Sequence, residues 1–267
     1  MTARRLTVSS LTLGDAPFGE RVRVAAEAGF GGVGLSVEVY QSALRSGLDD
    51  EAMRAILAEH GVAVTEVEFL SDWVATADTV PPTPKETTAF HIARAFGADH
   101  VNAGLFETTP LDALADGFTA LCERAGEVKV ALEYMPFAAV PDLGTAWEVV
   151  RGTGRANAGL VIDVWHWVRG GTEPAELDTV PADRVFAVQL CDISAEALVD
   201  MRHESLHHRL PPGSRTRHAQ DVVAILERHG VTAELSAEVM SDALLAQGFD
   251  VTAKAVFAGM KHVLDGR

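Results

Sequence analysis

The amino-acid sequence predicts an α/β fold, a single (β/α)8 TIM barrel that spans residues 1–267. Eight short apolar runs rich in β-branched residues are typical of buried parallel strands, and they alternate with amphipathic segments. Several of those segments end in glycine just before the next strand. With 48% hydrophobic residues and no Pro/Gly/Ser-rich linker, the chain can form one core of barrel size.

The expected elements follow one another in strict order. The expected strands are Leu6–Leu11, Gly32–Val37, Ala63–Glu68, His100–Ala103, Lys129–Tyr134, Leu160–Val164, Val185–Cys191 and Thr232–Val239. Between them, apolar residues recur at helical spacing, which predicts amphipathic helices. These helices are Phe18–Ala28, Asp50–His60, Lys85–Phe96, Asp112–Glu127, Leu143–Arg151, His218–His229 and Val251–Leu264. Glycines stand where helix C-caps are expected, at Gly29, Gly61, Gly97 and Gly230.

Strand–helix units in this alternation, joined by right-handed crossovers, close most naturally into a barrel. A doubly wound open sheet is the alternative architecture. After the first strand, however, Gly14 and Gly19 do not have the spacing of a dinucleotide-binding fingerprint. We therefore expect the barrel.

The chain is strongly acidic, and its charge restricts its partners. The 22 Lys and Arg residues against 38 Asp and Glu residues give a net charge of -16, which repels nucleic-acid backbones and anionic membranes. We expect neither as a partner. The sequence shows neither a signal peptide nor an apolar run of membrane-spanning length, which predicts a cytoplasmic protein. Its two cysteines, Cys122 and Cys191, indicate free buried thiols rather than a disulfide framework.

Polar side chains stand near the ends of the last four expected strands, at Glu133, Asp163, Gln189 and Glu238. The C-terminal mouth of a barrel is where its active site lies, so these side chains are expected to converge. Converging carboxylates repel one another, and a bound divalent cation relieves that repulsion. Oxygen ligands favour Mn²⁺, Mg²⁺ or Co²⁺, with Zn²⁺ as an alternative. Each acid taken singly is more often a helix N-cap or a rim salt bridge, but together they favour a metal site.

The same segments resemble the xylose isomerase-like TIM-barrel superfamily, and the resemblance covers most of the chain. It is carried by LEYMP at Leu132–Pro136, DVWH at Asp163–His166, AVQLCD at Ala187–Asp192 and LSAEVMSD at Leu235–Asp242. The superfamily holds sugar isomerases and epimerases, inosose dehydratases, 3-dehydroshikimate dehydratases and endonuclease IV. The resemblance implies that the four strand-end residues hold one divalent metal. One difference from the family matters for the reaction: most sugar isomerases and epimerases have histidine where this chain has Gln189, whereas 3-dehydroshikimate dehydratases have glutamine.

Endonuclease IV is a poor match in chemistry. It uses several zinc ions bound by many histidines, and its barrel mouth attracts DNA. This chain has 10 histidines, few of them at strand ends, and a net charge of -16. We therefore expect no DNA substrate.

Three residues are expected to carry the chemistry: Glu133 and Glu238, as proton-transferring carboxylates, and His166. His166 follows Asp163 by three residues, a spacing that can bring both to the mouth, and in the family the matching histidine touches substrate. Its alternative interpretation is a histidine packed between two tryptophans. The resemblance also implies that Arg209, which precedes a Pro-Gly pair in the segment Leu206–Gly213, reaches substrate oxygens.

Further substrate-binding candidates are less specific. Glu68 and Asn102 end the third and fourth expected strands, and each is as often a structural cap. His208 lies beside Arg209 in a connection that is otherwise expected to be solvated. Trp165 is expected to form an apolar wall over the mouth, suited to the face of a sugar or cyclohexane ring, together with Trp73, Trp167 and Phe137.

The expected function is that of a divalent-metal-dependent isomerase or epimerase of carbohydrate metabolism. It would act through an enediolate on a small polyhydroxylated keto substrate, a sugar or a cyclitol. A metal-dependent dehydratase of the 3-dehydroshikimate or inosose type is the alternative, and a homo-oligomer is left open. A non-catalytic ligand-binding barrel would need its carboxylates engaged in salt bridges, and the scarcity of Arg and Lys near them in the sequence argues against it.

Overall fold

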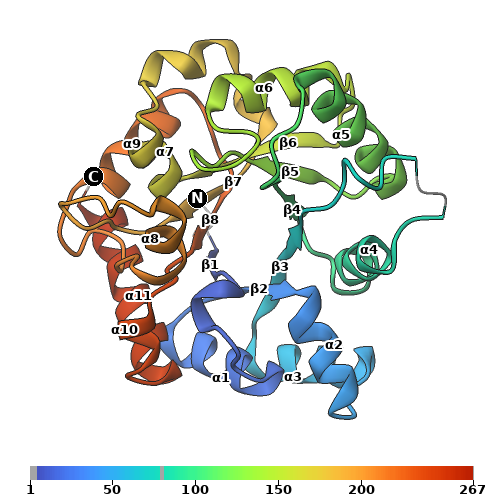
Figure 1. Ribbon diagram of the computed structural model, residues 1–267. Coiled ribbons are helices and arrows are strands. Elements are labelled where there is room, and N and C mark those ends of the chain that lie inside the picture. The colour runs from blue at the N-terminus through green and yellow to red at the C-terminus, as the bar shows by residue number, and fades with distance from the viewer. Residues whose placement is uncertain (1–4, 79–80, 267) are drawn as a thin grey trace.

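The computed structural model describes residues 5–78 and 81–266, and its centre is a closed barrel of parallel strands in chain order, β1 to β8 (Figure 1). The strands are β1 (Leu6–Val8), β2 (Gly32–Ser36), β3 (Ala63–Leu70), β4 (His100–Ala103), β5 (Val130–Glu133), β6 (Ala158–Asp163), β7 (Val185–Leu190) and β8 (Glu234–Ala237). β1 pairs with β8 and so closes the ring. The predicted (β/α)8 barrel is therefore confirmed.

Helices form a ring outside the strands (Figure 1). They are α1 (Phe18–Ala28), α2 (Val37–Arg45), α3 (Asp50–His60), α4 (Pro84–Phe96), α5 (Leu111–Ala125), α6 (Leu143–Gly152), α7 (Val164–Gly170), α8 (Met201–His207), α9 (His218–Arg228), α10 (Asp242–Leu245) and α11 (Phe249–Asp265). The predicted C-caps at Gly29, Gly61 and Gly97 are confirmed, because each adopts a left-handed conformation. Within the described chain, none of these helices has the length and apolar character needed to cross a membrane.

Short helices that the sequence did not predict follow directly after strands. α2 begins where β2 ends, and the Ser36 hydroxyl accepts a hydrogen bond from the Val39 amide. α7 begins after β6 in the same way, with the Asp163 carboxylate accepting from the His166 amide at 2.9 Å. The expected loop at Leu206–Gly213 is wrong at its start, because α8 extends to His207. Ser36 and Asp163 thus satisfy N–H groups at the start of α2 and α7, so β2 and β6 pass into these helices without a loop.

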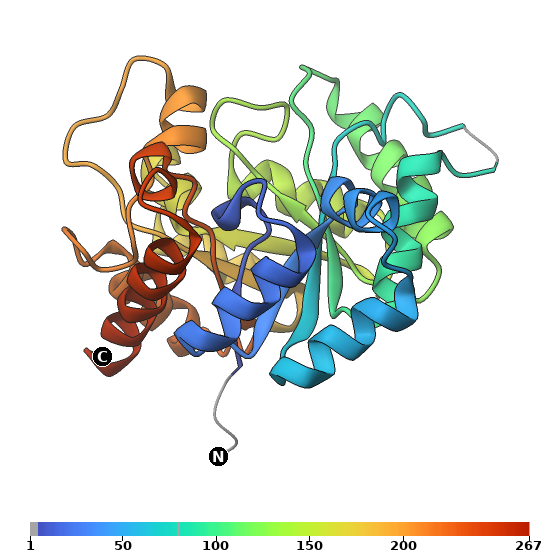
Figure 2. The same ribbon diagram turned by 90° about the horizontal axis from the view of Figure 1, so that it is seen from below.

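The interior of the barrel below its mouth is polar at several levels. Thr7 and Thr65 are hydrogen bonded at 2.8 Å, and the Ser236 hydroxyl donates to Glu66 at 2.6 Å across the barrel. Gly34 on β2 leaves the space that this arrangement needs. A β-carbon there would lie 2.6 Å from the backbone nitrogen of Ser10 and about 3 Å from carboxylate oxygens of the two β3 glutamates. Figure 2 shows the barrel from the side, with α8 (orange) at its upper edge.

Candidate metal centre

Three of the four predicted metal ligands converge at the mouth of the barrel. Glu133 ends β5, Asp163 ends β6, and Glu238 directly follows β8. One carboxylate oxygen of each lies within 4.8 Å of the others, and all three side chains are buried. This spacing lets a single cation contact all three carboxylates.

Gln189, the fourth predicted ligand, lies on β7 beside Asp163 and is fully buried. Its amide nitrogen donates to Glu238 at 3.0 Å, whereas its amide oxygen has no hydrogen-bond partner among the described residues. A buried amide oxygen without a partner is costly. Turning the amide over would present that oxygen to the carboxylate cluster, which suits a cation between them. The donor set therefore fits a hard divalent ion.

Arg209 is the cation that the carboxylates already have. Its Nη1 lies 2.8 Å from Asp163 and 2.9 Å from Glu238, and the side chain is almost wholly buried. Ser205 accepts two further hydrogen bonds from the same guanidinium. The expectation that basic side chains are scarce near these carboxylates is therefore wrong for Asp163 and Glu238.

The charges of the cluster do not balance with Arg209 alone. Three carboxylates and one guanidinium leave two negative charges (-3 + 1 = -2) in a buried space. Burial of unpaired charge costs several kcal/mol per ion, so these groups must take up protons or a cation. One divalent ion supplies the missing charge.

The pKa shifts of the cluster agree with this deficit. Burial raises the pKa of Glu133 to about 8, with repulsion from Asp163 adding to the effect and Arg209 opposing it. Burial likewise raises the pKa of Glu238 well above its ordinary value. Burial would lower the pKa of Arg209, but Asp163 and Glu238 raise it above its ordinary value. Without a cation Glu133 therefore holds its proton into the neutral range, and protonation of Glu238 is favoured as well.

His166 lies directly beside this cluster. Its Nε2 is 3.2 Å from an oxygen of Glu133, and the ring is buried. Burial lowers the pKa of His166 to about 4, although Asp163 acts in the opposite direction. The neutral imidazole can share a proton with Glu133, which is what an acid–base pair requires.

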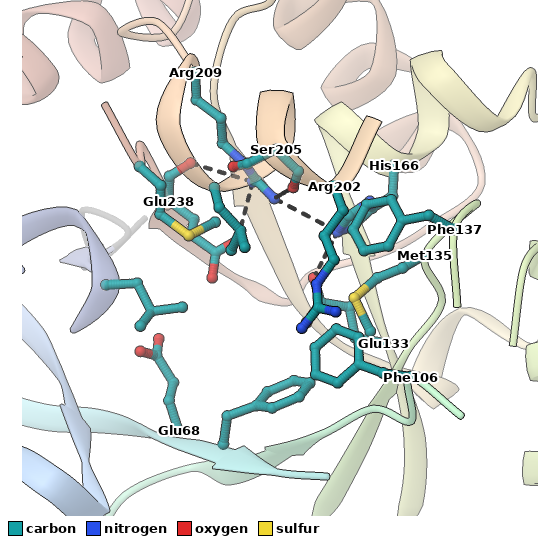
Figure 3. Close-up of a pocket in the computed structure, with 14 residues that line it drawn as sticks. Glu68, Phe106, Glu133, Met135, Phe137, His166, Arg202, Ser205, Arg209 and Glu238 are labelled. Carbon is teal, nitrogen blue, oxygen red and sulfur yellow. Dashed lines mark hydrogen bonds and ion pairs between the residues drawn. The ribbon is translucent and has the colours of Figure 1, made fainter. Parts of the chain in front are cut away.

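A cavity of about 180 Å³ opens onto these residues (Figure 3). Its polar lining consists of Glu68, Glu133, His166, Arg202, Ser205, Arg209 and Glu238. Its apolar lining consists of Leu11, Phe69, Phe106, Met135, Phe137, Leu206 and Met240. A reacting group at the carboxylates is therefore enclosed by side chains that exclude water.

Glu68 faces this cavity from β3 (Figure 3). Burial and the charge of the neighbouring Glu66 raise its pKa well above the ordinary value. Glu66 was not predicted as a site residue, and burial raises its pKa to about 7 while the bond from Ser236 lowers it. A neutral Glu68 can donate a hydrogen bond to a substrate hydroxyl.

The other predicted substrate-binding residues do not line the cavity. Asn102 is buried on β4. His208 is exposed, and its ring lies 3.2 Å from that of His203. Trp165 is fully buried, with its ring 5.2 Å from His166 and the Arg209 guanidinium 5.8 Å from it. Trp165 therefore supports two site residues from behind.

Of the aromatic wall that was expected over the mouth, only Phe137 lines the cavity. Trp73 is instead fully buried and packs against Phe118 of α5. Trp167 is also buried. The observed wall instead includes Phe69, near the end of β3, and Phe106, which follows β4, with their rings 6.1 Å apart.

Arg202 and Ser205, both on α8, are cavity residues that sequence reasoning missed. The one signal for this helix is Asp200, whose side chain caps it by accepting from the His203 amide. A helix of seven residues carries too few apolar positions to show a helical period. Its place over the mouth depends on tertiary contacts.

We expect metal-free protein to lose stability as the pH rises from about 6.5 to about 8. Folded Glu133 keeps its proton up to pH 8, whereas the unfolded side chain is ionised above about 4.5, so rising pH favours the unfolded state. Neutral His166 opposes this trend only below its unfolded pKa of 6.5. Saturating Mn²⁺ needs ionised ligands, so it should raise the melting temperature more at pH 8 than at pH 6.5.

Differential scanning fluorimetry at both pH values, with and without Mn²⁺, measures this effect. Mg²⁺ at the same concentration tests whether the response depends on the ion. Melting curves that saturating metal leaves unchanged at both pH values would favour the empty, salt-bridged barrel.

Comparison with known proteins relates this chain to a wider group. Residues 22–255 match the family described as the xylose isomerase-like TIM barrel. A 3-dehydroshikimate dehydratase from Pseudomonas aeruginosa is 30% identical over 136 residues, which cover 50% of this chain and 21% of that protein. An inosose isomerase from Halalkalibacterium halodurans is 29% identical over 114 residues, covering 42% and 39% of the two chains. The chain thus spans far less than two thirds of either curated relative's length.

A solved structure of the IolI protein with a bound zinc atom has the same fold. It superimposes with a TM-score of 0.81 at 15% sequence identity, over 98% of both chains. At that identity the likeness concerns the fold alone.

Proposed function

The chain belongs to the xylose isomerase-like TIM-barrel family, and from that premise we propose that it is a divalent-metal-dependent enzyme that enolises a small polyhydroxylated ketone. Isomerisation or epimerisation is the proposed outcome. The observation that carries this proposal is the buried carboxylate cluster, two charges short of balance, at the inner end of a cavity. The related dehydratase and isomerase are both enzymes, which supports a catalytic barrel. A cytoplasmic location and a homo-oligomer stay predictions.

The cation would be held by the predicted ligands Glu133, Asp163, Gln189 and Glu238. When bound, it supplies Lewis acidity to a ketone oxygen and a neighbouring hydroxyl, which makes the adjacent C–H more acidic. Mn²⁺, Mg²⁺ and Co²⁺ suit this set of oxygen donors, and Zn²⁺ is the alternative.

Proton transfer falls to the side chains that face the cavity. Glu133 and Glu238 approach it from β5 and β8 (Figure 3). Either carboxylate can take the proton from the carbon next to the carbonyl. Return of that proton to the opposite face gives an epimer, and return to the neighbouring carbon gives an aldose–ketose isomer. His166, 3.2 Å from Glu133, can receive the proton and hold it between the two steps.

Proton exchange tests the proposed reaction directly. We would incubate the protein with keto sugars, inososes and 3-dehydroshikimate in deuterated buffer, with Mn²⁺, Mg²⁺ or Co²⁺ present. NMR should show deuterium at the carbon next to the carbonyl of at least one substrate, together with an epimer or isomer. Absence of exchange in every combination, with metal shown to be bound, would overturn the proposal.

Dehydration is a second candidate, and Gln189 favours it. An amide oxygen is a weaker donor than an imidazole, so it leaves a bound cation more electrophilic and aids loss of a poor leaving group. The 3-dehydroshikimate dehydratase relative agrees with this reaction. A conjugated enone that absorbs in the ultraviolet would identify dehydration, and epimer or isomer without such a product would exclude it.

We expect His166→Ala to separate proton removal from dehydration, if dehydration is the reaction. The variant keeps all four metal ligands, so it should bind metal and still exchange the substrate proton. Without an imidazole to protonate the departing hydroxyl, product formation should fall about 10²- to 10⁴-fold. Deuterium exchange and ultraviolet absorbance are recorded on the same samples. Equal loss of exchange and of product would contradict this division.

A further inference from the structure

We propose that Arg202 binds a carboxylate group of the substrate, so that this enzyme acts on an acidic hydroxyketone, a keto-sugar acid or a cyclic keto acid. That the substrate is a hydroxyketone rests on the proposed function. The proposed carboxylate of the substrate is inferred from the surroundings of Arg202, which lines the same cavity beside Phe106 (Figure 3).

Arg202 reaches the cavity from α8, outside the carboxylate cluster (Figure 3). Its guanidinium carbon lies 4.7 Å from the centre of the Phe106 ring. A guanidinium over an aromatic face is held by a cation–π interaction and keeps its N–H groups at the edges available. The ring therefore fixes the charge at the cavity wall without using its hydrogen-bonding capacity.

The N–H donors of the Arg202 guanidinium are available to a ligand. Within residues 5–78 and 81–266, no carboxylate lies within salt-bridge distance of it and no hydrogen bond engages it. Arg209, the other arginine of the cavity, is committed to Asp163 and Glu238. Arg202 is thus the cavity cation that a ligand anion can engage.

Contacts on α8 hold this arginine in position. The residue two positions on, Glu204, is buried and forms an ion pair with Arg169. Ser205 accepts hydrogen bonds from Arg209 through both its hydroxyl and its carbonyl oxygen. The helix is therefore fastened to the same group that anchors the carboxylate cluster, which sets Arg202 at a constant place relative to the reacting end of the cavity.

Electrostatics favour a substrate with one negative charge at this place. The inner end of the cavity carries Glu133 and Glu238, and the chain has a net charge of -16, so an anion entering without a counter-charge is repelled. Arg202 supplies that counter-charge from the exposed edge of the cavity, beside the Phe106 ring, where an entering anion meets it. A single guanidinium matches the two oxygens of a carboxylate in a fork, whereas a phosphate dianion calls for more donors.

Binding of a matched acid and ester tests the assignment without turnover. The probes are shikimate, a ring hydroxy acid, and its neutral methyl ester, titrated by calorimetry into the Mn²⁺-loaded protein. Wild type should bind the acid at least about tenfold more tightly than the ester. Arg202→Gln should weaken binding of the acid on the order of 10- to 100-fold and leave the ester unchanged. Arg202→Lys should recover part of the loss, because lysine keeps the charge but not the fork.

Arg228→Gln, an exposed change on α9, is the matched control and should bind both probes as wild type does. Equal affinity of wild type for acid and ester, equal weakening of both by Arg202→Gln, or tighter binding of inorganic phosphate than of shikimate would each overturn the proposal. The readout also separates it from the proposed function. If the protein prefers the acid but exchanges no substrate proton, the proposed reaction is wrong and the assignment of Arg202 stands.

Discussion

Replacing Glu133 or Glu238 by glutamine is expected to remove most of the bound metal and to lower turnover about 10²- to 10⁴-fold. Each substitution deletes one of three carboxylates whose oxygens lie within 4.8 Å of one another. The neutral amide leaves the cluster with one negative charge instead of two, which reduces its attraction for a divalent ion. Each variant also lacks a proton-transferring group, so excess metal should restore little activity.

Elemental analysis of the purified proteins, before and after dialysis against Mn²⁺, measures the metal, and proton exchange measures activity. Glu59→Gln is a matched control, because Glu59 is an exposed glutamate of α3, far in the sequence from the cluster. It should keep metal and activity. Stoichiometric metal in both Glu133→Gln and Glu238→Gln would show that these residues are not the metal ligands.

The fold was predictable because barrel strands leave a strong local signal. β4 has the predicted bounds, and α1 and α3 do as well. The differences are short helices such as α2 and α7, which begin at the residue after a strand. Asp163 shows why they were missed. It was weighed as either a helix cap or a metal ligand, yet one of its oxygens caps α7 while the other faces the cluster and Arg209.

The site was predictable where position along a strand decides it. The strands β5, β6 and β8 belong to one closed ring and end at the same mouth of the barrel. The convergence of Glu133, Asp163 and Glu238 at their ends therefore follows from the barrel itself. Arg209 is different, because its pairing with Asp163 depends on how the segment after β7 folds back over the mouth. Such a path is set by tertiary contacts. Arg202 was missed for the same reason, since α8 is held in place by the ion pair of Glu204 with Arg169, which lies 35 residues away in the chain.

Removal of the buried guanidinium is expected to produce the largest change in stability. Arg209→Met keeps much of the side-chain volume but leaves Asp163 and Glu238 without their ion-pair partner. Loss of one partner from a buried ion pair costs about 3–5 kcal/mol, so the free energy of unfolding of metal-free protein should fall by about that amount at pH 8. The lost bonds to Ser205 form part of that cost and do not depend on pH.

The pH dependence of this loss identifies its electrostatic part. Burial already raises the pKa of Glu133 to about 8, so at pH 5 Glu133 is protonated and needs no counter-charge, and the raised pKa of Glu238 acts in the same direction. The difference between wild type and Arg209→Met, measured by urea unfolding, should therefore be smaller at pH 5 than at pH 8. His166 charges on unfolding at pH 5, and loss of Arg209, which lowers the His166 pKa in the folded protein, reduces that cost in the variant, so His166 also makes the difference smaller at pH 5. Mn²⁺ at pH 8 should recover part of the loss, because it supplies positive charge to the same carboxylates. An equal loss at both pH values would mean that Arg209 acts through packing and its bonds to α8, and that the carboxylate cluster does not depend on its charge.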